Sequence, residues 1–183
     1  MPFDMFSFLG ASHEFGLYVQ FRVMRYKNGT HYPIVFTNKN GKKSMGTFWT
    51  DRPLLNVNPE HVYFYSPALR PFGSVLISGS FVAWLDFDME MPSDWHIFPS
   101  LIVSTGGGHH VYWRFDDFLF PECLSSMLNR LVDLYPLADP VARDITRFLR
   151  WPGTYNLKYS PARQCEIVNC SEKVYSYDEV MAL

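Results

Sequence analysis

The sequence predicts a single domain of the α+β class, and three observations lead to this prediction. Strand-like stretches separated by tight-turn signals fill the first third of the chain, as in an antiparallel meander. Further strand patterns occupy the middle, and apolar residues at helical spacing mark one amphipathic helix at 121–134. A chain of 183 residues can bury one core well and is short for two domains. We therefore expect one domain over 1–183, with an N-terminal module of about 1–80 and a second module of about 81–183.

The N-terminal module is expected to be a twisted meander that follows an irregular lead-in over 1–16. Asn28-Gly29 and Asn40-Gly41 are strong signals for tight turns, because asparagine and glycine readily adopt positive φ. Strands are predicted around these turns, and one more follows a connection rich in proline and asparagine. The expected strands are 16–23, 32–37, 45–50 and 61–66.

The second module is expected to begin with a strand at 82–88, followed by strands at 100–104 and 109–115 that a glycine turn joins. The helix at 121–134 comes next. A second helix is predicted from Asp139, whose side chain can cap it with Pro140 in its first turn, to about Arg150. The tail from about Cys165 is expected to form one strand and a short helix.

Charge and cysteine content narrow the class of protein. The formal net charge of −2 gives no overall basic field, but basic residues gather locally in the N-terminal module. Together with nearby aromatic residues they form a candidate surface for a nucleic-acid template. The three cysteines lack the spacing of a zinc site or a disulfide framework. No apolar run is long enough to span a membrane and no basic signal-peptide region is seen, so we expect a cytoplasmic protein with no membrane partner. The candidate template-binding residues are Arg22, Arg25, Lys27, Lys42 and Lys43.

The strand at 82–88 carries the most informative pair of residues. Successive side chains on a strand point to opposite faces, so Asp86 and Asp88 share one face with Trp84. The opposite face is apolar and suits a core. Two carboxylates side by side repel each other unless a cation lies between them or one is protonated. The pair therefore indicates a divalent metal site or, more simply, an exposed strand end with two solvated acids.

The glycine turn is the second informative stretch. Thr105 precedes three consecutive glycines, centred on Gly107, whose backbone can approach a ligand closely. On the strand that follows, His110, Tyr112 and Arg114 point to one face. An imidazole, a phenol and a guanidinium suit a phosphate better than a core. The simpler interpretation is a hairpin with an incidental pair of histidines.

The predicted second helix carries the third stretch. Arg143, Arg147 and Arg150 would line up on one face of this helix, where guanidinium groups repel one another unless an anion is present. Arginine forks match the oxygens of a triphosphate well. The simpler interpretation is a salt bridge between Arg147 and Asp144.

Taken together, the three stretches resemble the archaeo-eukaryotic primase superfamily, in particular the primase-polymerases of phages and plasmids. The resemblance spans about 60–160. Its pattern is Asp-x-Asp on a strand, then Ser/Thr-Gly-Gly-Gly-x-His-x-Tyr-Trp, then Asp-x-x-Arg-x-x-Arg-x-Pro-Gly-Thr-x-Asn-x-Lys. The resemblance implies the archaeo-eukaryotic primase catalytic core, an RRM-like sheet with helices packed against an N-terminal α/β module. The first motif ends in Asp where some relatives have Glu, and the sequence shows neither a helicase segment nor a zinc-binding cluster.

The resemblance also implies roles for single residues. Asp86 and Asp88 match the metal-binding acids of the first motif. Asp144 is the best match for the third acid, and Asp139 is the nearby alternative. The implied catalytic residues are Asp86, Asp88, His110 and Asp144. The implied nucleotide-binding residues are Thr105, Gly107, His110, Arg147, Arg150, Asn156 and Lys158.

The implied function is that of a template-dependent nucleotidyltransferase, a DNA primase or a DNA polymerase, in phage or plasmid replication. Asp86, Asp88 and Asp144 would hold two Mg²⁺ or Mn²⁺ ions. The implied partners are a single-stranded DNA template, a primer and dNTP or NTP, with a replicative helicase as a further partner.

Two other functions compete with this one. A non-catalytic module for single-stranded nucleic acid would use aromatic residues among basic ones, but acids on a binding face repel phosphate unless a metal intervenes. A nuclease of the rolling-circle initiator type would need two histidines on one strand face. The adjacent His109 and His110 point to opposite faces.

Overall fold

The computed structural model describes residues 3–37, 43–52, 54 and 57–183, with side chains described outside 35–45. The helices are α1 (Met5–Leu9), α2 (Pro121–Leu134) and α3 (Tyr177–Met181), with a 3₁₀ helix η1 (Pro140–Arg143). The strands are β1 (Val19–Lys27), β2 (Thr30–Pro33), β3 (Val35–Thr37), β4 (Lys43–Met45), β5 (Thr47–Thr50), β6 (His61–Tyr65), β7 (Ser80–Phe87), β8 (Leu101–Ser104), β9 (His109–Leu119), β10 (Leu149–Arg150), β11 (Tyr155–Asn156), β12 (Arg163–Gln164), β13 (Glu166–Cys170) and β14 (Val174–Tyr175).

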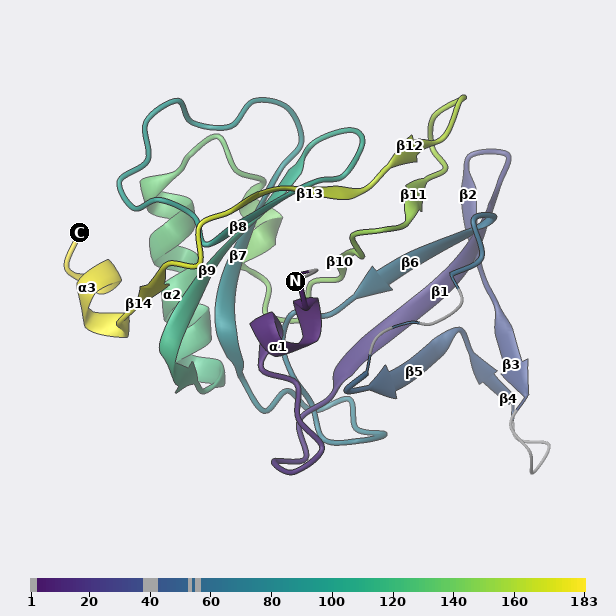
Figure 1. Ribbon diagram of the computed structural model, residues 1–183, viewed down its shortest axis with the longest axis horizontal. Helices are drawn as coiled ribbons and strands as arrows, with labels where there is room; N and C mark the ends of the chain where they lie inside the picture. The colour runs from purple at the N-terminus through teal and green to yellow at the C-terminus, as the bar shows by residue number, and fades with distance from the viewer. Residues whose placement is uncertain (1–2, 38–42, 53, 55–56) are drawn as a thin grey trace.

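Two larger sheets organise the described part of the chain (Figure 1). The first sheet has the order β10-β6-β1-β2, and β5 also pairs with β1. The second sheet has the order β13-β8-β9-β14, and β7 pairs with β9. Helix α2 packs on the second sheet, and α1 lies beside the junction of the two sheets. The predicted α+β class is confirmed. The first sheet takes its strand β10 from the C-terminal part of the chain, so the two modules share elements.

The hairpin predicted around Asn28-Gly29 is confirmed. These two residues connect β1 to β2 and both have positive φ, 50° and 80°, as a two-residue hairpin turn requires. Helix α2 has the predicted bounds, and the strands predicted at 61–66, 82–88 and 100–104 differ from β6, β7 and β8 by one or two residues at their ends. The turn predicted at Asn40-Gly41 lies outside the described residues.

The second helix, predicted from Asp139 to about Arg150, is wrong. Only η1 forms, because the carboxylate of Asp144 accepts hydrogen bonds from the backbone N–H and the hydroxyl of Thr146, both at 2.8 Å, and turns the chain. The next residues then pair with β6 as β10, which buries Leu149 in the core and continues to the buried Trp151. The three arginines at 143, 147 and 150 therefore do not line one helix face.

The lead-in predicted as irregular contains the short helix α1. Asp4 caps it by accepting a hydrogen bond from the backbone N–H of Phe6 at 3.0 Å, and Gly10 ends it with a φ of 76°. Four of its five residues are buried. The rings of Phe6 and Phe8 contact Trp151 and Tyr112, so α1 fills the junction between the sheets.

Strands β7 and β8 of the second sheet are largely buried, whereas β13 at its edge is largely exposed. The predicted apolar face of β7, formed by Ala83, Leu85 and Phe87, is buried, and α2 covers this side of the sheet through Leu124, Met127, Leu128 and Leu131. On the opposite face, Trp84 and Tyr112 are fully buried where the second sheet meets the first. Asp86 of β7, the following Asp88 and His110 of β9 line a cleft at this end of the sheet.

A pair of buried tyrosine hydroxyls joins the two sheets. Tyr65 of β6 donates to the hydroxyl of Tyr112 of β9 at 2.5 Å, and burial raises the pKa of both phenols, so both are neutral at physiological pH. We expect Tyr112→Phe to lower the free energy of unfolding by about 1–3 kcal/mol, because the Tyr65 hydroxyl loses its partner. Tyr65→Phe/Tyr112→Phe should lower it less than the sum of the single variants, as urea unfolding of all four proteins would show. Additive losses would contradict this coupling.

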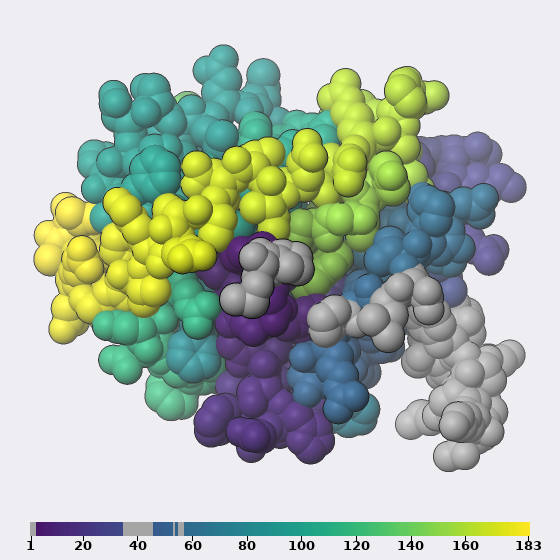
Figure 2. Space-filling view, in the orientation of Figure 1, coloured from purple at the N-terminus to yellow at the C-terminus, as the bar shows by residue number. Residues whose placement is uncertain are grey.

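The yellow C-terminal segment crosses the front of the molecule in Figure 2 and runs above the purple N-terminal segment. The side chain of Ser171 donates to the carbonyl of Pro99 at 2.7 Å, and Tyr175 donates to the carbonyl of Phe98 at 2.5 Å.

None of the helices in the described ranges has the length and apolar character needed to cross a membrane.

Candidate active site between the two sheets

The floor of the cleft is set by the register of two strands. Asp86 of β7 lies directly opposite His110 of β9, so the first two informative stretches of the sequence meet on one face of the second sheet. The His110 Nε2 atom lies 3.7 Å from the Asp86 Oδ1 atom. Burial, together with the nearby Arg150 and Arg147, lowers the pKa of His110 to about 3. His110 is therefore neutral at neutral pH, and this approach is not an ion pair.

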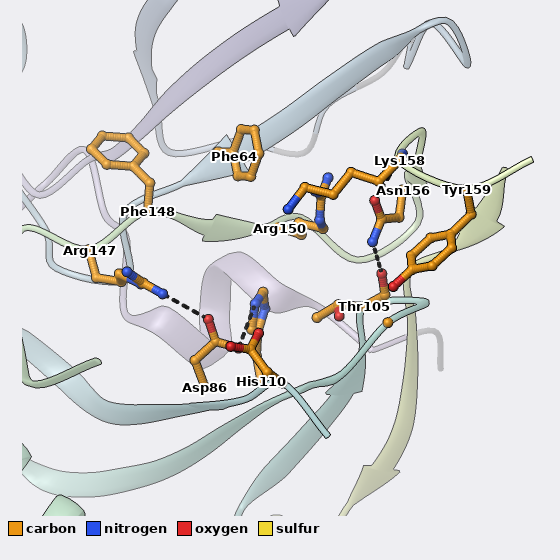
Figure 3. Close-up of a pocket in the computed structure, with 12 residues that line it drawn as sticks. Phe64, Asp86, Thr105, His110, Arg147, Phe148, Arg150, Asn156, Lys158 and Tyr159 are labelled. Atoms are coloured by element: carbon orange, nitrogen blue, oxygen red, sulfur yellow. Dashed lines mark hydrogen bonds and ion pairs between the residues drawn. The ribbon is translucent and has the colours of Figure 1, made fainter. Parts of the chain in front are cut away.

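Arg147 bridges two carboxylates at one end of the cleft. Its Nη2 atom lies 3.1 Å from Asp86 Oδ2 and 2.8 Å from Asp139 Oδ2 (Figure 3 shows the first contact). The backbone N–H of Asp139 also donates to the carbonyl of Asp86 at 2.7 Å. Burial raises the pKa of Asp86, while the hydrogen bond and charge of Arg147 act in the opposite direction. This end of the cleft thus holds a partly desolvated carboxylate that depends on a neighbouring cation.

The glycine turn forms the other end. The backbone N–H of Thr105 donates to the carbonyl of Gly108 at 2.9 Å, and Asn156 Nδ2 donates to the carbonyl of Thr105 at 2.9 Å. A side chain at Gly108 would collide with the backbone of Phe87 and Asp88, and one at Gly107 would collide with the hydroxyl of Tyr159. The turn needs glycine here because the backbone passes so close to the acidic strand and to Tyr159.

Arg150 belongs to β10 of the first sheet, and it lines the cleft. Its side chain is only 7% exposed, and its guanidinium carbon lies 4.9 Å from the ring centroid of Phe64. Burial lowers the pKa of Arg150 from its ordinary value. In the described part of the chain, Arg150 forms no ion pair and its Nη1 atom has no hydrogen-bond partner. A buried cation without a partner favours the binding of an anion in the cleft.

The cleft brings together most of the residues that the sequence singled out (Figure 3). Asp144 is not among them, because its exposed carboxylate caps the turn at Thr146. Asp139, the alternative third acid, instead lies near Asp86, because the Arg147 guanidinium contacts both carboxylates. The predicted residues that line the cleft are Asp86, Asp88, Thr105, Gly107, His110, Arg147, Arg150, Asn156 and Lys158.

The architecture is similar to those of solved primase structures. The AEP domain of the primase-polymerase of cyanophage S-2L superposes with a TM-score of 0.67 at 15% identity, covering 90% of this chain and 88% of that one. This chain has the fold of an archaeo-eukaryotic primase catalytic domain. The primase RepB′ matches this primase fold with a TM-score of 0.59 at 14% identity over 98% of this chain and 62% of that one. The catalytic domain of primase RepB′ in complex with initiator DNA matches with a TM-score of 0.54 at 13% identity. The match covers 91% of this chain and 87% of that one. Neither protein-family models nor curated protein sequences match the chain.

The donor chemistry of this primase fold suits a hard divalent cation at the acidic end. Asp86 and Asp88 line the cleft, and Asp88 and Asp139 also line an adjoining hollow. Carboxylate oxygens are ligands that Mg²⁺ and Mn²⁺ prefer. Among the described residues no three acids, histidines or cysteines are close enough to share an ion. The Arg147 guanidinium lies between Asp86 and Asp139. A cationic group is therefore already accommodated between two of the three carboxylates.

The candidate template residues do not form a single surface on this primase fold. Residues alternate along β1, so Arg22 lies on the face that overhangs the cleft, and Arg25 and Lys27 lie on the other face. Lys42 lies outside the described residues. Lys43 is in β4, and its side chain is not described.

Three residues that line the cleft are not predicted from the sequence. Phe64 and Phe148 form its roof, and the exposed Tyr159 stands beside the glycine turn, where the guanidinium of Arg163 stacks on its ring at 3.8 Å. Alternation in the aromatic strand β6 could have separated Phe64 from the buried Tyr63 and Tyr65. Nothing in the local sequence marks Phe148 or Tyr159.

Proposed function

We propose that this chain is a template-dependent nucleotidyltransferase that joins nucleoside triphosphates on single-stranded DNA, as a DNA primase, a DNA polymerase or both. The observation that carries the proposal is the two-ended cleft. Carboxylates gather at one end, and the buried, unpaired guanidinium of Arg150 faces them across His110. A nucleoside triphosphate with bound metal has the complementary charges, because its phosphates are anionic and its metal is cationic. The structural neighbours named primase and primase-polymerase add support.

The basic end of the cleft would bind the triphosphate. Arg150 would hold phosphate oxygens from a site that is already desolvated, so the contact would be strong. The exposed Lys158 would add a flexible charge at the mouth. Neutral His110 can donate one hydrogen bond to a phosphate oxygen without adding charge beside Arg150. Asn156 and Thr105 would keep the glycine turn in place behind the phosphates.

The acidic end would hold Mg²⁺ or Mn²⁺ through Asp86 and Asp88, with Asp139 as the third acid in preference to Asp144. When bound, these ions would activate the attacking hydroxyl and neutralise charge on the triphosphate. Arg147 holds the carboxylates of Asp86 and Asp139 by ion pairs and partly neutralises them. The proposed partners are a single-stranded DNA template, a primer, dNTP or NTP and a replicative helicase, in the context of phage or plasmid replication.

Nucleotide incorporation on a defined template tests the proposal. The purified chain would be incubated with single-stranded DNA, labelled nucleotides and Mg²⁺ or Mn²⁺, with and without an annealed primer. We expect template-dependent extension in gels, abolished when the template is omitted or the metal is chelated. Product without a primer would add priming activity. The absence of incorporation under every condition, with tight metal-independent binding of the template, would instead identify a non-catalytic binding module.

A further inference from the structure

A second buried arginine lies outside the nucleotide cleft. Arg70 is 3% exposed, and its guanidinium donates to the carbonyl of Val75 and, at 3.4 Å, to the hydroxyl of Ser66. Its Nε atom has no partner among the described residues. Neither Arg70 nor the neighbouring Arg22 forms an ion pair within the described ranges. A buried guanidinium without a carboxylate favours an anion that comes from outside the chain.

The two arginines line one hollow of about 240 Å³, which is room for a phosphate group and its waters. Burial lowers the pKa of Arg70, and the charge of Arg22 lowers it further, so the two cations repel each other across the hollow. The described lining holds no acid. It consists of Gln20, Arg22, Arg70, Val75, Thr146 and Phe148.

We propose that the Arg22–Arg70 hollow binds a backbone phosphate of the nucleic-acid strand that leads into the nucleotide cleft. That the hollow binds an anion is argued from its two arginines alone. That this anion belongs to a nucleic acid rests on the proposed function.

The position of Phe148 links the hollow to the cleft. Phe148 lines both, and the Arg22 guanidinium stacks on its ring at 3.9 Å. Arg22 pairs with Phe64 in the neighbouring strand, and Phe64 pairs with Arg150, so the three side chains share one face of the first sheet. A nucleic-acid strand lying along this face of the sheet would pass from the hollow, over Phe148, to Arg150.

Aromatic and apolar side chains continue the path on the other side of the hollow. Trp49 pairs with Gln20 and so lies on the same sheet face, and its ring nitrogen donates to the carbonyl of Ser74 at 3.0 Å. The same loop exposes Phe72 and Leu76, which are 70% and 74% accessible. Rings beside arginines are typical of surfaces that stack unpaired bases while they bind phosphates. A single strand therefore fits these features better than an isolated phosphate ion.

Binding of a fluorescent single-stranded oligonucleotide, measured by anisotropy without nucleotide or metal, tests the inference. We expect Arg22→Gln and Arg70→Met each to weaken binding on the order of tenfold. The slope of log affinity against log salt should become shallower by about 0.7 for each phosphate that a variant no longer binds. Arg130→Gln removes the same charge from α2, which packs against the far face of the second sheet, and should bind like the wild type.

Arg22→Gln keeps the test decisive if Arg70→Met does not fold, because Arg22 is exposed and supports no described ion pair. Wild-type affinity and salt slope in a folded Arg22→Gln protein would overturn the inference. Stabilisation of the wild type by inorganic phosphate, absent in the variants while oligonucleotide binding is unchanged, would mean a free-phosphate site and would also overturn it. The assay needs no catalysis, so a chain that incorporates no nucleotides but shows the Arg22 effect would refute only the proposed polymerase function.

Discussion

Asp86→Asn is expected to abolish nucleotide incorporation, with a loss of at least about a thousandfold, while the protein keeps its fold. Asp86 is the carboxylate that faces His110, Arg147 and the adjoining Asp88 at once. Asparagine has the same shape and can still accept a hydrogen bond from Arg147, but it cannot supply the negative charge that a divalent ion needs. Gel-based extension of a labelled primer, with Mg²⁺ or Mn²⁺ titrated, would measure the loss.

The fold of this variant should survive because Arg147 keeps its ion pair with Asp139 at 2.8 Å. We expect the free energy of unfolding to fall by no more than about 2 kcal/mol. Asp133→Asn is a matched control, since Asp133 is exposed on α2. It lines neither the cleft, nor the adjoining hollow at Asp139, nor the Arg22–Arg70 hollow. Extension by Asp86→Asn at the rate of the control, at any metal concentration, would refute the metal assignment.

Arg150→Met is expected to weaken nucleotide binding by about a hundredfold without lowering stability. A charge-assisted contact in a desolvated site contributes about 1.5–3 kcal/mol, and the fork of Arg150 can make two such contacts with one phosphate. Because Arg150 is 7% exposed and has no described ion-pair partner, methionine removes a desolvated charge that the nearby Asp86 carboxylate offsets without a direct ion pair. Calorimetric titration with a nucleoside triphosphate would measure the affinity, and thermal unfolding the stability.

Arg150→Lys separates charge from geometry at the same position. Lysine keeps the charge but loses the planar fork, so its affinity should lie between those of the wild type and Arg150→Met. Arg130→Gln controls for net charge. A triphosphate affinity that is unchanged in Arg150→Met would place the phosphates elsewhere, and a large drop in its melting temperature would mean that Arg150 is mainly structural.

The local sequence pattern was sufficient to predict an element where the residues of that segment alone decide its structure. The Asn28-Gly29 turn, the apolar face of β7 and the helical period of α2 are of this kind, and all three are seen in the fold. Helical spacing failed where a local side-chain hydrogen bond or a distant strand competes with the helix. Residues 144–150 have helical spacing, but Asp144 binds Thr146 and Leu149 pairs with Tyr65, so turn and strand replace the helix. Helix α1 was missed because it is a single short turn stabilised by burial against the two sheets.

The sequence by itself determined the chemistry of this protein: two acids two residues apart on a strand, a glycine turn before a histidine, and arginines that follow. Only the tertiary structure decided which of these groups meet. It brings Arg147 to Asp86 across 61 positions of sequence and pairs it there with Asp139 as well. It leaves Asp144 capping a turn and encloses Arg70 beside Arg22. The physical reason is that strand register and side-chain burial depend on pairing between distant segments, and local periodicity carries no information about that pairing.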